Sequence, residues 1–425
     1  MRCTLLLLAA LSATHAMGQS GPMSLQEAIT FARANSPMLK AARAEFLGAL
    51  ANERGAKAML GPQVSVNGFT TTGNNTSILG SVPKTDPAVS MQVPPGQFSD
   101  GNLMLMLPIL AGDVKAMAAS AKWQSQAAAG DYREAEAELE LSVRQSYFVV
   151  KSMHEDVLAA QASYEALLEM LKTTKARFEA GKTIEASVQR VQAELSRAER
   201  DLKTAKNSEA KAYLDLLQVI GGKLDAQIQL LGLTDPETKT FQIEELVKSA
   251  MANRGMLMAN AARTKASEAE LRAAKALSAP RLYATGMADA TNRRDMGGVT
   301  LGLSMSFPLF DGGRVKSEIE KAKSMKARAE ADLASAKLQV EKEVRQSLLD
   351  YETALENLKS ATASAQAASS AFDVISVRVE AGKAILLEQL DALDLLTRAR
   401  TDVAKARLDL LTAFARLSRS TGGDL

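Results

Sequence analysis

The sequence predicts a mainly α-helical protein with a smaller β part, built from two copies of one long unit. The first observation is a repeat: R-F-E-A-G-K at 177–182 returns as R-V-E-A-G-K at 378–383. The second is a pair of long stretches without proline that carry an apolar residue at every seventh position. The third is a strict alternation of apolar and small polar residues in short runs. A duplication of this length is typical of an architecture rather than of a catalytic site.

The first residues have the pattern of a secretory signal peptide. Arg2 precedes an apolar run over 5–11, and small residues follow around 13–18. This pattern predicts a signal over residues 1–18, cleaved after Ala16 or Gly18. The apolar run is too short to span a bilayer. We therefore expect the protein to leave the cytoplasm.

Composition argues against an enzyme, a metalloprotein and a nucleic-acid-binding protein. Cys3 is the only cysteine and lies in the predicted signal, as does His15, so His154 is the one histidine of the mature chain. With one histidine and no cysteine, a zinc or copper site is not expected. The 51 basic and 49 acidic residues nearly cancel, which does not favour a polyanion-binding surface. We expect no cofactor and no bound metal.

Each copy begins with two helices. Ser24 and Glu27 form a capping-box pattern for a short first helix, and Pro37 ends it. A second helix is expected to continue to about Met59. In the second copy Gly255 stands at the position equivalent to Pro37, and the matching second helix is expected over 256–277.

A two-residue period follows the helices and predicts two hairpins, at 62–110 and 280–310. In the first copy the strands are expected at 63–71 and 102–107, joined by an exposed Asn/Ser/Pro/Gly-rich loop over 72–101. In the second copy the alternation is clearest near position 300, where apolar residues are separated by small or hydroxylated ones at 300, 302, 304 and 306. The apolar members are Leu301, Leu303, Met305 and Phe307.

Two very long helices are expected over 113–178 and 313–379, the second opened by Asp311-Gly312-Gly313. About 65 helical residues make a rod of roughly 100 Å, which requires a bundle, a fibre or a tube. The seven-residue period predicts left-handed coiled-coil packing. Its members are Val143, Val150, Val157, Tyr164, Leu171 and Phe178 in the first copy, and Val344, Tyr351, Leu358, Ala365, Phe372 and Val379 in the second.

Four amphipathic strands per chain have a consequence if they face lipid. A sheet in hydrocarbon must close, because an open edge leaves unpaired N–H and C=O groups. Four strands cannot close, since membrane barrels need about eight. Several chains would therefore contribute to one barrel, with the apolar residues at 301–307 toward lipid and the small polar ones toward a wet lumen. The alternative is a soluble four-stranded subdomain with one apolar face.

Four segments carry a resemblance to a known family. They are L-G-L-S-M-S-F-P-L-F-D-G-G-R at 301–314, the two E-A-G-K turns at 179–182 and 380–383, and L-D-A-L-D-L-L-T-R-A-R-T-D-V-A-K-A-R at 390–407. They resemble the TolC-type outer-membrane efflux protein family over nearly the whole mature chain. The resemblance implies a fold that is mainly α with a β-barrel part: a homotrimer whose twelve-stranded transmembrane β-barrel continues into a coiled-coil α-barrel.

The resemblance also implies a function, a location and a domain division. It implies a porin-like channel subunit without enzyme activity, in the outer membrane of a Gram-negative bacterium and extending into the periplasm. Expected partners are outer-membrane lipid, a periplasmic adaptor and an inner-membrane pump of the RND or ABC type, for efflux or type I secretion. The expected parts are the signal 1–18, a first repeat 19–222 with tip 179–183 and helix 184–220, and a second repeat 223–425 with tip 380–384 and helix 385–420, the segment near 222–250 forming an equatorial belt.

Two sets of residues become site candidates through the resemblance. Gly181, Lys182, Gly382 and Lys383 would form the tips that contact the adaptor; the alternative is a plain helix turn. Glu388 and Asp391 match acidic residues that line the family's periplasmic constriction; the alternative is a solvated helix face. The sequence departs from the family at Ser187, where an acid is expected, and at Val379, where a tyrosine is common.

Three other functional classes fit the sequence less well. A secreted coiled-coil filament does not account for four alternating strands, and a periplasmic adaptor protein of a transport complex would not be duplicated along its full length. For an enzyme, Glu341 and Glu343 are better interpreted as solvated helix charges. Gly312-Gly313 lacks the remaining residues of a phosphate-binding loop.

Overall fold

A computed structural model describes residues 22–73, 96–226, 228–232, 239–291 and 297–423. The predicted signal peptide, most of the loop expected at 72–101 and parts of the turn after 291 and of the 222–250 segment lie outside the described residues. Among the described helices, none has a stretch long and apolar enough to cross a membrane.

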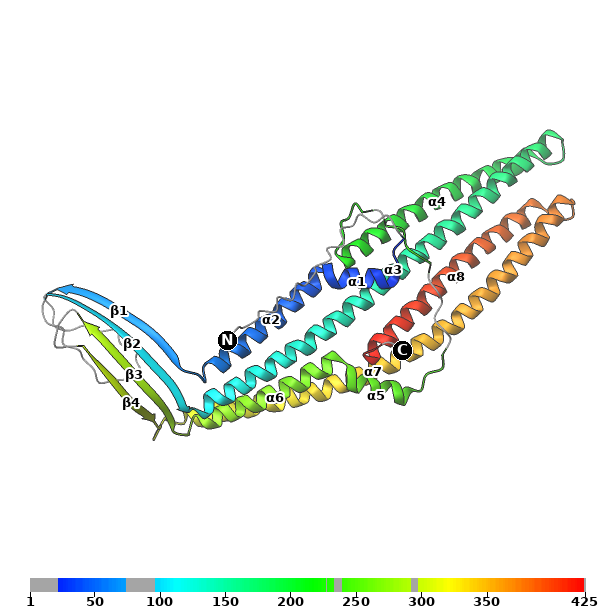
Figure 1. Cartoon of the computed structure of the whole chain (residues 1–425). Helices are drawn as coiled ribbons and strands as arrows, with labels where there is room; N and C mark the ends of the chain where they lie inside the picture. The colour runs from blue at the N-terminus through cyan, green and yellow to red at the C-terminus, as the bar shows by residue number, and fades with distance from the viewer. Residues whose placement is uncertain (1–21, 74–95, 227, 233–238, 292–296, 424–425) are drawn as a thin grey trace, which may run out of the picture. The chain divides into compact units, whose positions relative to one another are not determined.

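The same order of elements occurs twice (Figure 1), as the repeat predicts. Each copy runs helix, helix, strand, strand, very long helix, helix. The first copy comprises α1 (Leu25–Asn35), α2 (Pro37–Ala58), β1 (Gln63–Gly73), β2 (Gly96–Leu110), α3 (Gly112–Glu179) and α4 (Glu185–Ile220). The second comprises α5 (Ile243–Asn253), α6 (Gly255–Ala276), β3 (Arg281–Thr291), β4 (Gly298–Ser306), α7 (Arg314–Glu380) and α8 (Leu386–Thr421).

The compact units of the structure do not coincide with the sequence repeats. One unit, the helical unit, contains residues up to 42, 133–254 and 339–425. The other, the sheet unit, contains 43–132 and 255–338. Each therefore draws segments from both repeats, and the helices α3 and α7 each contribute to both units.

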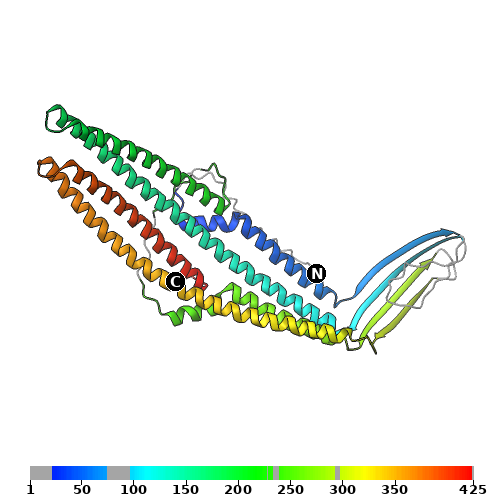
Figure 2. The ribbon, with the colours of Figure 1, turned by 180° about the vertical axis from the view of Figure 1, so that it is seen from behind.

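The helical unit contains two helical hairpins, α3 with α4 and α7 with α8 (Figure 2). The predicted seven-residue seam forms its interior: Val143, Val150 and Val344 are fully buried and Tyr351 nearly so. Towards the end of α3, Leu171 packs in a cluster with residues of α4 and α8. Only Phe178, the last member of the first series, is substantially exposed. The seven-residue period is thus confirmed as a packing seam along nearly its whole length.

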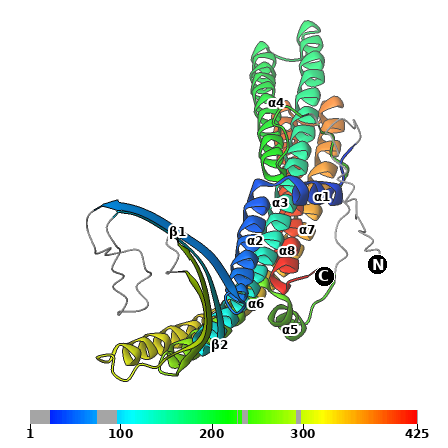
Figure 3. The ribbon, with the colours of Figure 1, turned by 60° about the vertical axis from the view of Figure 1, so that its left-hand side comes forward.

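The sheet unit contains one antiparallel sheet in the order β1-β2-β3-β4, curved as Figure 3 shows. The two hairpins follow the chain, and the β2–β3 pairing joins the two repeats. Below the sheet, α3 and α6 approach so closely that a Cβ on Gly130 would lie 2.7 Å from the backbone nitrogen of Ala259. Glycine is required at that crossing because any side chain would push the helices apart.

Several strand boundaries differ from the expectation, including the end of β1 at Gly73 and the end of β2 at Leu110. β2 begins at Gly96 rather than near 102, because pairing with β1 continues to the Gly73–Gly96 pair. β4 ends at Ser306, opposite Arg281, the first residue of β3, so Phe307 lies outside the strand. Pro308 follows and has no N–H for a further ladder bond. Phe307 is therefore not a member of the strand face to which the pattern assigned it.

Candidate functional site

The sheet separates its side chains into an apolar and a polar face across all four strands. Directly paired residues of antiparallel strands project to the same face, so the register defines rows. One row runs Val64–Leu105–Gly286–Leu301, and the next runs Val66–Leu103–Ala288–Val299. The rows between them are Gln63–Met106–Thr285–Gly302, Ser65–Met104–Met287–Thr300 and Asn67–Asn102–Asp289–Gly298. The alternation seen in β4 is therefore a property of the whole sheet.

The apolar face is exposed in the single chain. Val66, Leu301, Leu303 and Met305 have exposed fractions of 79%, 78%, 69% and 71%. Soluble monomeric proteins rarely leave a continuous apolar surface of this kind in water. The predicted orientation of Leu301, Leu303 and Met305, all on one face, agrees with the register. The face also includes residues of β1 and β2 that the single-strand pattern could not assign.

The two tips have the same backbone geometry. Gly181 and Gly382 both have positive φ, 71° and 70°. At the first tip the amide of Lys182 donates to the carbonyl of Arg177 at 2.8 Å, and at the second the amide of Lys383 donates to that of Arg378 at 2.8 Å. These bonds end each helix in a Schellman-type cap, which favours glycine at the left-handed position. A Cβ on either glycine would meet nothing within 4 Å, so backbone conformation rather than crowding requires glycine there.

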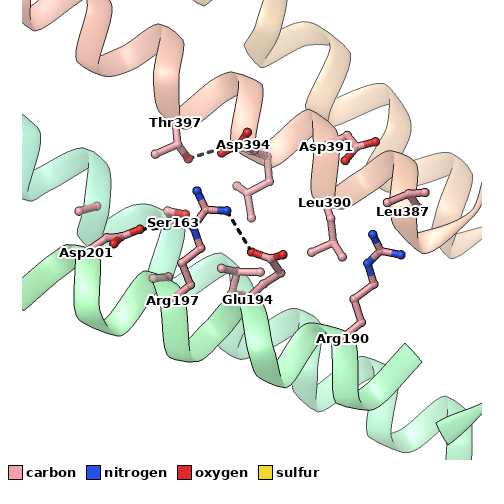
Figure 4. A pocket seen from close by; sticks show the side chains of 14 residues that line it. Ser163, Arg190, Glu194, Arg197, Asp201, Leu387, Leu390, Asp391, Asp394 and Thr397 are labelled. Atoms are coloured by element: carbon pink, nitrogen blue, oxygen red, sulfur yellow. Dashed lines mark hydrogen bonds and ion pairs between the residues drawn. The ribbon is translucent and has the colours of Figure 1, made fainter. Parts of the chain in front are cut away.

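The two acidic candidates lie on the exposed side of α8. Glu388 is in the first turn of the helix and Asp391 follows, while Leu390 and Leu393 between and beyond them are buried. Asp391 lines a groove of about 200 Å³ formed by α3, α4 and α8, and Glu388 does not. Figure 4 shows Arg190 extending from α4 toward Leu387 on the α8 side of this groove. The structure thus separates the surroundings of the two carboxylates.

Charges of both signs line this groove. Arg197 lies 3.8 Å from both Glu194 and Asp201 on its own helix, while Asp394 pairs with Arg398 at 2.7 Å on α8. These side chains are largely exposed, so water screens each pair. The groove therefore presents a mixed polar surface above the apolar cluster of Leu167, Leu390 and Leu393.

The helical unit contains a buried arginine that no sequence pattern indicated. Arg254 lies between α5 and α6 with 2% of its side chain exposed, and donates to Glu134 and Glu343, both at 2.9 Å. Arg419 of α8 also contacts Glu134 and Glu343, at 2.9 and 3.6 Å. The interpretation of Glu343 as a solvated charge is therefore wrong, because the fold brings two arginines to it; Glu341 pairs with Arg345 on the same helix at 2.8 Å. We call Arg254, Arg419, Glu134 and Glu343 the arginine network.

Two tyrosines contact the segment near 222–250, the predicted belt. The hydroxyl of Tyr147, fully buried on α3, lies 3.0 Å from the carbonyl of Met23 and 2.9 Å from that of Leu231. Burial raises the pKa of Tyr147 to about 12. In the second copy the hydroxyl of Tyr351 accepts a longer bond, 3.4 Å, from the amide of Lys239.

Comparison with known proteins identifies the family. The profile of the family described as "Outer membrane efflux protein" matches residues 28–222 and 246–423, one match to each repeat. The chain belongs to this family. Both matches include a hairpin of the sheet, a long helix and a glycine tip, so the features described above are those of an outer membrane efflux protein.

Related outer membrane efflux proteins include TolC. Outer membrane protein TolC of Escherichia coli (strain K12) is 25% identical over 301 residues, which are 66% of this chain and 61% of TolC. TolC of Vibrio cholerae is 24% identical over 71% of this chain and 72% of its own length. The match to the E. coli protein therefore covers less than two thirds of it.

Solved structures share the fold of this family member. The outer-membrane channel OprN has a TM-score of 0.79 at 21% identity, over 94% of this chain and 90% of its own. The CmeC outer membrane channel of Campylobacter jejuni has a TM-score of 0.79 at 17% identity, over 94% and 85%. A mainly helical chain with four strands, expected from the sequence, is thus the fold of known outer-membrane channels.

Proposed function

We propose that the chain is one subunit of an outer-membrane channel that conducts solutes passively from the periplasm to the exterior. The observation that carries the proposal is the register: one face of the sheet is apolar from β1 to β4. Lipid can cover that face, but β1 and β4 are then open edges whose backbone groups need partners. Three chains, each supplying four strands, close a twelve-stranded barrel above the minimum of about eight.

Assembly and conduction test this proposal together. The full-length protein is extracted from membranes in detergent and its mass is measured, then it is reconstituted into a planar bilayer. A particle of three chains that conducts ions is expected. A stable monomer that remains soluble without detergent contradicts the channel, because it would show that the apolar face does not need lipid.

The tips are proposed as the contact with a periplasmic adaptor, through which an inner-membrane pump of the RND or ABC type would deliver cargo for efflux or type I secretion. The two tips share sequence and cap geometry, and Lys182 and Lys383 are exposed beside the glycines. Lys182→Glu and Lys383→Glu change charge without straining the glycines. Loss of adaptor binding in the double variant, with trimers intact, is expected; unchanged binding would limit the tips to a structural turn.

Glu388 and Asp391 are proposed as the selectivity residues of the periplasmic opening. Threefold symmetry would repeat each exposed carboxylate three times, and such a group of charges attracts cations. Glu388→Ala with Asp391→Ala should weaken cation selectivity and block by multivalent cations in planar-bilayer recordings. Ser187 and Arg190 occupy the equivalent positions of the first repeat, so Ser187→Ala with Arg190→Ala is the matched control. Equal effects of the two pairs contradict the assignment.

A further inference from the structure

Three methionines lie together on the polar face of the sheet. Met104 of β2 is directly paired with Met287 of β3, and Met106 is paired with Thr285, two residues from Met287. Directly paired side chains have Cβ atoms about 5 Å apart and diagonal neighbours about 7 Å apart. Three flexible thioether side chains can therefore reach one point above the β2–β3 pair.

Their position is unusual for apolar side chains. Residues paired with them on the same face are hydroxylated or amide-bearing: Ser65, Gln63, Thr285 and Thr300. Met106 and Met287 keep exposed fractions of 39% and 41%, so both residues remain accessible in the single chain. Burial in lipid cannot account for them, because the apolar rows of the sheet project to the other side.

The second repeat shows that the fold does not require methionine there. When the two repeats are aligned on Pro108 and Pro308, Met104 and Met106 correspond to Ser304 and Ser306. The apolar positions are kept in the two repeats, with Leu103 and Leu105 corresponding to Leu303 and Met305. The two thioethers of β2 are thus specific to the first copy.

We propose that Met104, Met106 and Met287 form a binding site for a soft monovalent cation, Cu(I) or Ag(I), on the wall of the channel. Thioether sulfur is a soft ligand that prefers such ions over Mg²⁺, Ca²⁺ or Na⁺. Asp289 lies on the same face in the row next to Met287 and supplies a negative charge beside the cation. The expectation of no copper site was based on cysteine and histidine only and did not consider methionine thioethers. The site rests on the proposed channel, whose lumen this face would line.

Silver ion is the probe, because it is a stable Ag(I) reagent. The detergent-extracted wild-type protein is titrated with silver nitrate in a chloride-free buffer by calorimetry, and silver X-ray absorption then identifies the bound atoms. One tight site per chain with sulfur neighbours is expected. Met104→Leu with Met287→Leu keeps apolar bulk and removes two ligands, so at least a tenfold loss of affinity is expected.

Controls separate this site from other silver ligands. Met305→Leu removes an exposed thioether from the opposite face, and His154→Gln removes the single histidine outside the N-terminal segment; both should bind as wild type does. Unchanged affinity in the Met104/Met287 variant, or no tight site in the wild type, overturns the metal site and leaves the methionines as packing residues. A wild-type trimer that conducts while lacking the site disproves this inference alone, whereas failure to form a conducting trimer disproves the proposed function.

Discussion

The two repeats make the same backbone contact at their helix junctions but surround it with different chemistry. A Cβ on Gly221, after α4, would lie 2.8 Å from the carbonyl of Asn35 at the α1–α2 junction. A Cβ on Gly422, after α8, would lie 3.0 Å from the backbone carbonyl carbon of Asn253 at the α5–α6 junction. Both glycines have positive φ, 72° and 78°. The duplicated unit therefore preserves a close backbone approach that only glycine permits.

The residue that follows each asparagine is where the copies diverge. Ser36 and Arg254 occupy equivalent positions and are both 2% exposed. The serine adds no charge to its junction, whereas Arg254 draws Glu134 and Glu343 into the arginine network. The two copies thus share the backbone contact at this junction, and only the second copy has a buried charge there.

Removing the buried charge of Arg254 should have the largest effect and tests this difference between the copies most directly. Arg254→Ala leaves Glu134 and Glu343 with Arg419 as their remaining partner, and breaking a buried ion pair costs about 3–5 kcal/mol. Ser36→Ala should cost less than about 1 kcal/mol, because it removes only a hydroxyl. Chemical unfolding of the detergent-solubilised protein, followed by circular dichroism, measures both. Similar losses at the two junctions would show that Arg254 is no more important than its counterpart.

The two faces of the sheet provide the second contrast. An arginine facing lipid near the middle of a bilayer costs about 2–4 kcal/mol, so Leu303→Arg should reduce the amount of protein assembled in the membrane. Ser304→Arg, on the neighbouring residue and the opposite face, should be tolerated because that side would face water. Heat-resistant trimers extracted from membranes are counted for each variant. If both substitutions reduce assembly equally, the apolar face is not in contact with lipid.

The buried tyrosines differ between the repeats as well. Tyr147 corresponds to Leu348, and Tyr351 to Val150, so each copy has its own anchor for the segments around residue 230. Tyr147→Phe removes the hydroxyl donor of the Leu231 carbonyl, while the carbonyl of Met23 keeps the amide of Leu231 as a donor at 3.0 Å. The substitution should cost about 1–2 kcal/mol. Tyr351→Phe loses one long bond, so its effect should be smaller. Thermal unfolding of the two variants gives the order, and a larger effect at Tyr351 would contradict it.

Local features were predictable because they depend on nearby residues. The Ser24–Glu27 capping box forms as expected, with the amide of Ser24 donating to the Glu27 carboxylate at 2.8 Å. This backbone hydrogen bond and a second bond from the Ser24 hydroxyl hold the pKa of Glu27 below its ordinary value. The positive φ of Gly181 and Gly382 also followed from their positions after helices. Each of these depends on a few consecutive residues, so the sequence pattern is sufficient.

Features that depend on distant partners were not predictable. The arginine network joins residues 134, 254, 343 and 419, which no short motif relates. The first part of β2 has glycine and polar residues typical of a loop, yet pairing with β1 makes it a strand, since sheet context overrides local propensity. The adaptor contact and the constriction depend on other molecules, so the roles of the tips and of Glu388 and Asp391 stay predictions.

The smallest expected effect concerns a half-buried acid that differs between the copies. Asp156 of α3 corresponds to Asn357 of α7. Burial, assisted by the neighbouring charge of Glu155, raises the pKa of Asp156 above its ordinary value of 3.8. The folded chain then holds this proton more tightly than the unfolded chain. Its contribution to stability is therefore greatest below about pH 4 and declines as pH rises from 3.8 to the folded-state pKa.

Asp156→Asn should remove this dependence and make the first copy resemble the second. Because the amide has no charge to desolvate, the variant should unfold at a slightly higher temperature than wild type at pH 7, and the difference should shrink toward pH 4. Thermal unfolding at several pH values measures this trend, with Glu155→Gln, which removes the assisting charge, as the intermediate case. A variant that is less stable than wild type at pH 7 would mean that the Asp156 carboxylate has a favourable partner in the folded protein, and that burial is not the term that decides its effect.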